Sequence, residues 1–470
     1  MERAIVHSDI NHCYAQIEEM LNPELKQRPM AVGGSQEERH GIILAKNLHA
    51  KKYKIQTGET LDEARIKCPQ LLILPPDYRR YQRITDQVKA IYREYTDRVE
   101  EYGLDEAWLD LTQSQRLFGP ASQIARTIQQ RVYAELGLTI SIGLSFNKIF
   151  AKMASDFVKP SGFVTITRAN FQEKIYPLSV RELFYVGAAT QKKLEAWGIT
   201  TISDLAGRDR LFMRRYFGKV GEMLHWFALG EDISEVALAS EAIPVKSVGN
   251  SVTAVHDLHT HGEARLVLRV LAESVASRLR DQGLKGKGIA LSLRDIHLFR
   301  WSLQRKRARP TQLAEEILED AEILLRQAWQ NALPLRSIGI SVFDLCLDQT
   351  GEQLDLFVDE QHRQSLLQLE KTVDGIRRRF GFEKIQRCSL LLDKPLTSFN
   401  PNDSSDRFSQ RPDSSRQPIV KLKRSVNPPK QAQTAGKKGI SSRGQLAGSN
   451  RKNHDIMKPT KDEKRRLEIR

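Results

Sequence analysis

The apolar positions of the first 165 residues predict short strands that alternate with helices. Residues 4–10 are mostly apolar and carry Asp9 near their end, as in a short buried strand. Two extended runs bend near residues 103–106. In chain order, the elements that we expect after the first strand lie at 82–100 (helix), 99–111 (two strands), 121–136 (helix) and 138–146 (strand). Such alternation favours a mixed α/β fold.

The rest of the chain divides into blocks of different character. Residues 12–80 insert two helices, of which the second is basic and lies near 45–54, and residues 176–230 are mostly helical. We expect a β/α/β/β/α/β order at 247–255, 263–282, 287–295, 298–305, 311–332 and 335–345, and one more helix near 361–379. After about residue 397 polar residues dominate without periodicity, which predicts disorder. The prediction is therefore a multidomain α/β (α+β) chain with a disordered basic tail.

The charge of the chain is strongly uneven. Of the net charge of +15, residues 401–470 supply +11, from 18 Lys or Arg against 7 Asp or Glu. A basic chain suggests a polyanionic partner such as nucleic acid, although a basic tail is about as often only a solvated appendage. The charge alone leaves both interpretations open.

Several classes of protein are disfavoured by the sequence. No apolar run approaches the roughly 20 residues of a membrane-spanning helix, and the N-terminus does not resemble a signal peptide. The four cysteines are far apart and form no CxxC pair, so we expect neither a zinc site nor a disulfide framework. The expected location is the cytoplasm, without contact to a membrane.

Three carboxylates stand out as candidates for chemistry. Asp9 at the end of a buried strand needs a reason, because an unpaired buried charge is costly, but a strand-end cap is an ordinary one. Asp105 and Glu106 lie in the predicted bend, where both side chains can reach the same side. Together with a carboxylate on an adjacent strand they would offer hard oxygen ligands suited to Mg²⁺. Two such ions, about 3.5–4 Å apart, can serve phosphoryl transfer.

The segment HSDINHCYAQIEEMLNPELKQRPMAVGG (7–34) closely resembles the opening of the Y-family, DinB-type translesion DNA polymerases. The likeness continues in GIILAKNLHAKK (41–52), GLDEAWLDL (103–111), SIGLSFNKIFAKMASDFVKPSG (141–162), KSVGNSVTA (246–254) and RDIHLFRWSLQRKRARP (294–310). It covers about the first 345 residues in order. The resemblance implies template-directed addition of dNTPs to a primer 3′-hydroxyl, with low fidelity and bypass of damaged bases.

The resemblance also implies a right-hand architecture. Its expected parts are a palm (1–11 and 80–168), fingers (12–79), a thumb with a helix–hairpin–helix (169–238), a linker (239–246), a little finger (247–346), an extension with a clamp-binding peptide (347–396) and the tail (397–470). Two Mg²⁺ ions are expected in the palm. Asp9 and Asp105 would bind both ions, Glu106 the primer-side ion, and the backbone carbonyl of Ile10 the nucleotide-side ion. Gly103 replaces the serine that the family usually has two residues before Asp105.

The resemblance assigns the nucleotide pocket to five positions. Tyr14 matches the aromatic steric gate that excludes a 2′-hydroxyl, and Cys13 is expected to pack as a pocket wall without a redox role. Lys159 matches the palm lysine that holds the β- and γ-phosphates. On the fingers helix the family usually has a Tyr and an Arg where this chain has Leu48 and Lys51. Lys51 supplies a point charge without a bidentate fork.

Further positions are expected to contact macromolecular partners. In the thumb, Gly187 and Ala189 would present backbone N–H groups to a DNA phosphate, with Ala189 in place of the family's second glycine. In the little finger, the basic run Arg305, Lys306, Arg307 and Arg309 would follow the template backbone. The pentapeptide formed by Gln353, Leu354, Asp355, Leu356 and Phe357 closely resembles a sliding-clamp-binding peptide.

The expected partners are therefore primer–template DNA, dNTPs and the sliding clamp, bound by a monomer. Two alternatives to an active polymerase remain at this point. One is an inactive, clamp-tethered scaffold, which the presence of all three carboxylates disfavours. The other is a different palm-based nucleotidyl enzyme, which would need neither a helix–hairpin–helix nor a clamp peptide.

Overall fold

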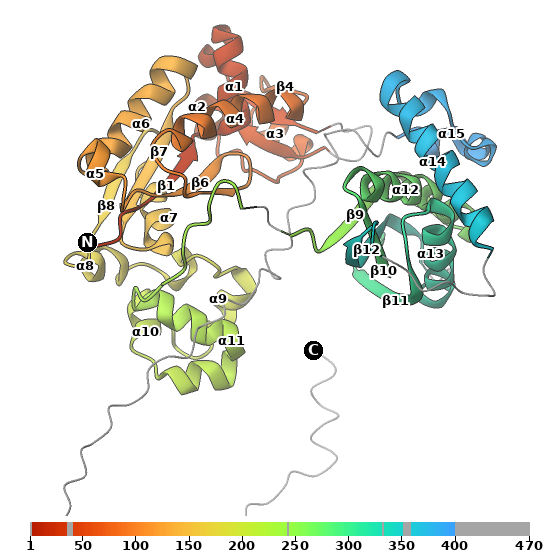
Figure 1. The fold of residues 1–470 in the computed structure, drawn as a ribbon. Helices are drawn as coiled ribbons and strands as arrows, with labels where there is room; N and C mark the ends of the chain where they lie inside the picture. The colour runs from red at the N-terminus through yellow and green to blue at the C-terminus, as the bar shows by residue number, and fades with distance from the viewer. Residues whose placement is uncertain (1, 35–40, 242–243, 331–332, 351–358, 400–470) are drawn as a thin grey trace, which may run out of the picture. The chain divides into compact units, whose positions relative to one another are not determined.

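The structure is a computed structural model that describes residues 2–34, 41–241, 244–330, 333–350 and 359–399 (Figure 1). The expected clamp peptide Gln353–Phe357 and the tail from residue 400 lie outside the described residues. No described helix is both long and apolar enough to cross a bilayer. The described elements form three sheets with helices packed on them, in agreement with the predicted mixed α/β fold.

A five-stranded sheet in the order β5-β6-β1-β7-β8 carries the candidate carboxylates. Its strands are β1 (Ile5–Ile10), β5 (Val99–Tyr102), β6 (Glu106–Asp110), β7 (Ile140–Ser145) and β8 (Phe163–Ile166). All neighbouring strands are antiparallel except β7 and β8. The central strand β1 is buried along its whole length, which confirms the prediction of a buried first strand.

Helices cover both faces of this sheet (Figure 1). On one face, α4 (Tyr78–Arg93) and α6 (Ala121–Leu136) pack through Val88, Ile91, Ile124 and Ile128 in one core with Val6 and Ile10 of β1. On the other face lies α7 (Lys148–Phe157), which packs on β1 and β7. Since side chains alternate along a strand, Asp9 and His7 point to the face of α7. The helix α5 (Gln115–Phe118) follows β6.

Residues 12–79 form a smaller unit around the three-stranded sheet β3-β2-β4. Its elements are α1 (Cys13–Leu21), the 3₁₀ helix η1 (Pro23–Gln27), β2 (Met30–Gly33), β3 (Ile43–Lys46), α2 (Leu48–Lys52), α3 (Leu61–Lys67) and β4 (Leu72–Leu74). The buried side chain of Asn47 caps α2 by accepting from the Ala50 N–H and donates to Glu19, Leu25 and Arg28. This network fixes where the basic helix α2 begins.

The following region is helical, as predicted. It contains α8 (Phe171–Ile175), η2 (Val180–Glu182), α9 (Ala188–Glu195), α10 (Ile202–Ala206) and α11 (Arg210–Ala228). The last of these helices, α11, is kinked at residue 218. Gly218 breaks α11 with φ of 67°, a left-handed conformation that glycine adopts at little cost.

The fourth region has the predicted β/α/β/β/α/β order and a sheet in the order β11-β10-β12-β9. Its elements are β9 (Ser247–Leu258), α12 (His261–Asp281), β10 (Leu284–Asp295), β11 (Arg300–Thr311), α13 (Ala314–Ala328) and β12 (Leu335–Leu347), followed by α14 (Glu360–Phe380), η3 (Phe382–Lys384), η4 (Cys388–Asp393) and α15 (Lys394–Thr397). Our predicted boundary between strand and helix was wrong, because β11 extends to Thr311. The basic run 305–309 therefore lies within a strand.

Candidate active site

The sheet brings the three candidate carboxylates to one edge of the palm-like region. Asp9 of β1 lies directly opposite Glu106 of β6. Cross-strand partners of this kind have Cβ atoms about 4.5–5.5 Å apart. Asp105 occupies the turn before β6, and its carbonyl accepts from the Ile10 N–H at 3.0 Å. The turn contains Gly103 with φ of 76°, which explains why glycine suits the position where the family usually has serine.

Two lysines already neutralise this carboxylate group. Lys159 Nζ lies 3.1 Å from Asp9 Oδ2 and 2.7 Å from Asp156 Oδ1. Lys152 of α7 pairs with Glu106 Oε2. Lys159 lies in the turn that leads to β8, where Gly162 is required because a Cβ atom would come within 1.9 Å of the Val158 carbonyl oxygen.

The electrostatics of the site favour the binding of a cation. Burial raises the pKa of Asp9 to about 7, although the charge of Lys159 opposes this, and burial also raises the pKa of Asp105. Burial acts in the same direction on Glu106, but its neighbours His7 and Lys152 outweigh it and lower its pKa to about 2. Asp9 therefore lacks enough positive charge around it to be fully ionised at neutral pH.

The donor set fits a hard divalent cation by its chemistry. Carboxylate oxygens and the adjacent Ile10 carbonyl are the ligands that Mg²⁺ prefers. Within the described residues, no group of three or more acidic, His or Cys side chains is already arranged as a metal centre. The ion pairs account for this, because Glu106 is turned to Lys152 and Asp9 to Lys159.

The candidate steric gate is fixed by aromatic packing. The Tyr14 ring of α1 stacks on Tyr81 with centroids 4.5 Å apart and planes 13° apart, and Tyr78 meets it edge-on at 5.7 Å. Tyr81 is fully buried and donates to Glu18 at 2.7 Å. Cys13 is buried in the same core, and burial raises the pKa of its thiol well above the usual range, which suits a packing role.

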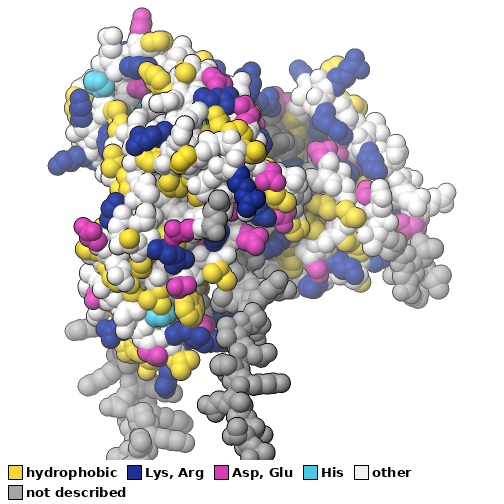
Figure 2. Space-filling model, turned by 60° about the vertical axis from the view of Figure 1, so that its left-hand side comes forward, with side chains coloured by type: hydrophobic (Ala, Val, Ile, Leu, Met, Phe, Trp, Pro, Cys, Tyr) yellow, Lys and Arg dark blue, Asp and Glu magenta, His cyan; other side chains and the backbone are white. Residues whose placement is uncertain are grey.

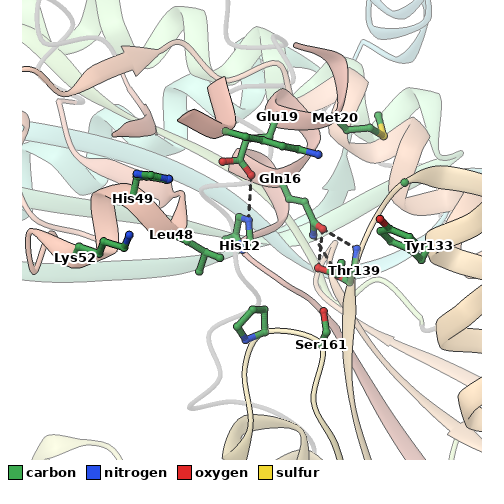
Figure 3. Close-up of a pocket in the computed structure, with 13 residues that line it drawn as sticks. His12, Gln16, Glu19, Met20, Leu48, His49, Lys52, Tyr133, Thr139 and Ser161 are labelled. Atoms are coloured by element: carbon green, nitrogen blue, oxygen red, sulfur yellow. Dashed lines mark hydrogen bonds and ion pairs between the residues drawn. The ribbon is translucent and has the colours of Figure 1, made fainter. Parts of the chain in front are cut away.

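Of the positions assigned to the triphosphate, Leu48 lines a cavity of about 440 Å³ between α2 and the turn that contains Ser161 (Figure 3). Figure 3 shows α2 with Leu48, His49 and Lys52 on one side and Thr139 and Ser161 on the other. Lys51 and Lys159, the two lysines assigned to the phosphates, are not among the residues that line this cavity. Lys46, which sequence reasoning missed, lies near Lys51. Burial lowers the pKa of Lys46, and the charge of Lys51 lowers it further.

The positions assigned to DNA contacts differ in their surroundings. Gly187 is the N-cap of α9, and Ala189 lies in the first turn of that helix. Arg305 and Arg307 of β11 pair with Asp320 of α13, while Lys306 points to the other face of the sheet and pairs with Asp344. On the face shown in Figure 2, Lys and Arg side chains lie scattered among acidic and apolar ones.

Comparisons with known proteins agree with this arrangement. The impB/mucB/samB family matches residues 8–156, and its C-terminal domain matches residues 245–356. A DNA polymerase IV of Acetivibrio thermocellus is 43% identical over 396 residues, which cover 84% of this chain and 99% of that protein. A DNA polymerase IV of Moorella thermoacetica is 38% identical over 82% of this chain and 95% of its own length.

The fold has a counterpart among solved structures. A Y-family DNA polymerase chimera of Dbh and Dpo4 matches with a TM-score of 0.67 and 21% identity, over 73% of this chain and 99% of that one. The chain thus belongs to the impB/mucB/samB family and, within it, to the DinB-type DNA polymerases of the Y family. It is a DNA-directed DNA polymerase of the translesion type that uses DNA and dNTPs, and dependence on a divalent metal ion comes with this identity.

Sequence reasoning missed the groups behind the carboxylates. His7 is fully buried, and its Nδ1 lies 2.8 Å from Ser155 Oγ. Lys152 reaches Glu106 from a helix 46 residues away in sequence. The only signal in the sequence was that Lys148, Lys152 and Ser155 share one face of a helix that follows a buried strand.

Proposed function

We propose that this polymerase works with two Mg²⁺ ions held by Asp9, Asp105, Glu106 and the Ile10 carbonyl. The observation that carries the proposal is the placement of the three carboxylates on neighbouring strands, with Asp9 directly opposite Glu106. When bound, the ions would activate the primer 3′-hydroxyl and stabilise the departing pyrophosphate. The protein contributes the fixed positions of the carboxylates and a site from which most water is excluded.

Lys159, Lys51 and Lys46 are proposed to hold the triphosphate. Lys159 would exchange its contact with Asp9 for the β- and γ-phosphates once cations neutralise that carboxylate. The proximity of Lys46 to Lys51 supports a paired positive charge on the fingers, in place of the family's single arginine.

Tyr14 is proposed as the steric gate, with Cys13 as a wall of the same pocket. Stacking on Tyr81 and edge contact with Tyr78 leave the Tyr14 ring little freedom to move away from a 2′-hydroxyl. The rigidity of this aromatic cluster supports sugar selection by exclusion.

Contacts to macromolecular partners complete the proposal. The first turn of α9 at Gly187–Ala189 presents N–H groups to a DNA phosphate. On β11, Arg305, Lys306 and Arg307 were all assigned to the template backbone, and Lys306 is the one on the sheet face away from α13. Gln353–Phe357 would dock on a sliding clamp through Leu356 and Phe357. We further propose that the enzyme acts as a monomer in the cytoplasm.

Primer extension tests the proposal directly. The full-length chain should extend a primed DNA template with Mg²⁺ and dNTPs, and should use ribonucleotides poorly. Tyr14→Ala should raise ribonucleotide use by about 100-fold relative to dNTP use, since the clash with the 2′-hydroxyl is removed. Tyr216→Ala is the matched control, because it removes a tyrosine ring of α11 that packs with Trp197 and Phe212 and not with Tyr14. Sugar discrimination that stays unchanged in Tyr14→Ala would remove the gate role, and failure of the wild type to extend bound primer would overturn the proposed function.

A further inference from the structure

Two lysines of α7, one helical turn apart, form ion pairs with the hairpin β5–β6 from one side. Lys148 Nζ lies 2.6 Å from Glu100 Oε1 on β5, and Lys152 pairs with Glu106 on β6. Each lysine also lies against an aromatic ring of the hairpin, and Lys152 lies against Phe184 of the following helical region as well. Lys148 is 4.6 Å from the Trp108 ring centroid, and Lys152 is 5.4 Å from those of Tyr102 and Phe184.

The two lysines are closely matched except in their partners. Both side chains are 12% exposed. The partner of Lys148 is Glu100, whose second oxygen accepts from the Ala237 N–H at 3.0 Å, so this carboxylate is committed to structure. The partner of Lys152 is Glu106, the carboxylate assigned to the primer-side metal ion. Of the two ion pairs, the one between Lys152 and Glu106 therefore involves a proposed metal ligand.

His7 lies behind Glu106 but does not hold it. His7 is fully buried, and its Nδ1 faces Ser155 of α7. The Ser155 hydroxyl donates to the Lys152 carbonyl at 2.7 Å, which leaves its oxygen to accept from His7 Nδ1 at 2.8 Å. His7 Nε2 lies 3.4 Å from Glu106 Oε2, and no hydrogen bond joins these two atoms. The contact that orients Glu106 is the ion pair with Lys152.

We infer that Lys152 is a positioning residue that holds Glu106 in one orientation and, by its charge, weakens the binding of the primer-side metal ion. Lys152 is itself held by Tyr102, the cross-strand partner of Glu106, and by Phe184 of the following helical region. A fixed positive charge next to a ligand repels a cation, while a fixed ligand orientation favours turnover. Lys152 therefore lowers the affinity of the site for the metal ion and keeps Glu106 in the orientation that favours turnover. This inference rests on the proposed role of Glu106.

Mn²⁺ binding measured by electron paramagnetic resonance separates these two effects. The probe is Mn²⁺ added to the full-length enzyme bound to a dideoxy-terminated primer–template and a dNTP, so that no turnover occurs. Lys152→Met should tighten the Mn²⁺ site by about three- to tenfold, since one nearby charge is removed. In parallel, kcat for primer extension with Mg²⁺ should fall by about 10- to 100-fold, because Glu106 loses its orientation. A purely structural role of Lys152 would weaken binding and turnover together.

Lys148→Met is the matched control, with the same substitution one turn away on the same helix. It should leave the Mn²⁺ dissociation constant unchanged, whereas Lys152→Arg should restore the weaker binding of the wild type because it restores the charge. Lys152→Gln replaces Lys152→Met if the latter does not fold. Unchanged or weaker Mn²⁺ binding in the Lys152 variant, or equal tightening in Lys148→Met, would overturn the inference. Glu106→Gln tests the metal role of Glu106 separately from the positioning role of Lys152. If this variant binds Mn²⁺ as tightly as the wild type, the proposed metal role of Glu106 is wrong.

Discussion

The palm sheet (β5-β6-β1-β7-β8) and the little-finger sheet (β11-β10-β12-β9) both carry ion pairs between basic and acidic side chains. The pairs of the two sheets differ in whether the acidic group can still bind a cation. In the palm, Lys159 and Lys152 contact Asp9 and Glu106. In the little finger, Arg305 and Arg307 share Asp320, which is 4% exposed. The palm pairs place the acidic group at the proposed reaction site. The little-finger pairs tie a strand to the helix that covers it.

The balance of charge explains the difference. In the palm, burial keeps the pKa of Asp9 near 7 in spite of Lys159, so the acidic cluster still lacks positive charge. In the little finger, Asp320 has two arginine partners, and Arg307 also contacts Glu316. A cluster short of positive charge can recruit a cation, whereas a saturated one serves stability. The number of partners that each buried acid has therefore separates the two roles.

Asp105→Asn tests the palm side of this comparison and should have the largest effect. The amide cannot supply the charge of a bridging metal ligand, so the rate of primer extension should fall by at least about 10³-fold. Since burial already raises the pKa of Asp105, the neutral isostere should not lower the free energy of unfolding. Extension rates, DNA binding and urea unfolding measure the three properties. Activity within tenfold of wild type would contradict the metal role.

Asp320→Asn is the corresponding change in the little finger and should have the opposite outcome. It leaves Arg305 and Arg307 without their shared partner, and breaking a buried pair from one side costs about 3 kcal/mol. Urea unfolding should report this loss of stability. Primer extension at 25 °C should stay within a few-fold of wild type, and a loss of activity without a loss of stability would refute the structural role of the pair.

The pH dependence of stability tests the charge balance at Asp9. Its pKa in the folded, metal-free protein is about 7, above the usual value of 3.8. The folded state therefore retains a proton that the unfolded state has lost, and stability falls as the pH rises from about 4 to about 7. Asp9→Asn removes this penalty and should stabilise the metal-free protein by about 2 kcal/mol at pH 8. At pH 4 the gain should vanish. An equal effect at both pH values would show that Asp9 is fully ionised in the wild type.

The sequence predicted where the three carboxylates lie in the fold, because they stand at strand ends and turns, which local patterns locate, whereas their role as metal ligands stays a prediction. Asp9 and Asp105 needed no knowledge of packing. The partner of Glu106 depended on how α7 lies on the sheet, and no local pattern in the sequence encodes this. Which face of the sheet Arg307 occupies depends on where β11 ends. This strand ends at Thr311 and not near residue 305 as predicted. Within a continuous strand the residues alternate between faces, so the basic run is divided between them.

Lys306 and Arg307 are sequence neighbours on opposite faces of β11. Comparing them separates a basic side chain that is available to DNA from one that stabilises the fold. Lys306 and its partner Asp344 are both largely exposed, and such a pair contributes about 0–1 kcal/mol, so the lysine can exchange it for a phosphate. Lys306→Ala should lower the slope of log K against log salt for DNA binding by about one, without a change in stability. Arg307→Ala should leave that slope unchanged but lower the urea midpoint, because Asp320 and Glu316 lose a buried partner. If Arg307→Ala changed the salt slope as much as Lys306→Ala, both faces of the strand would contribute to DNA binding, and the separation of roles by face would fail.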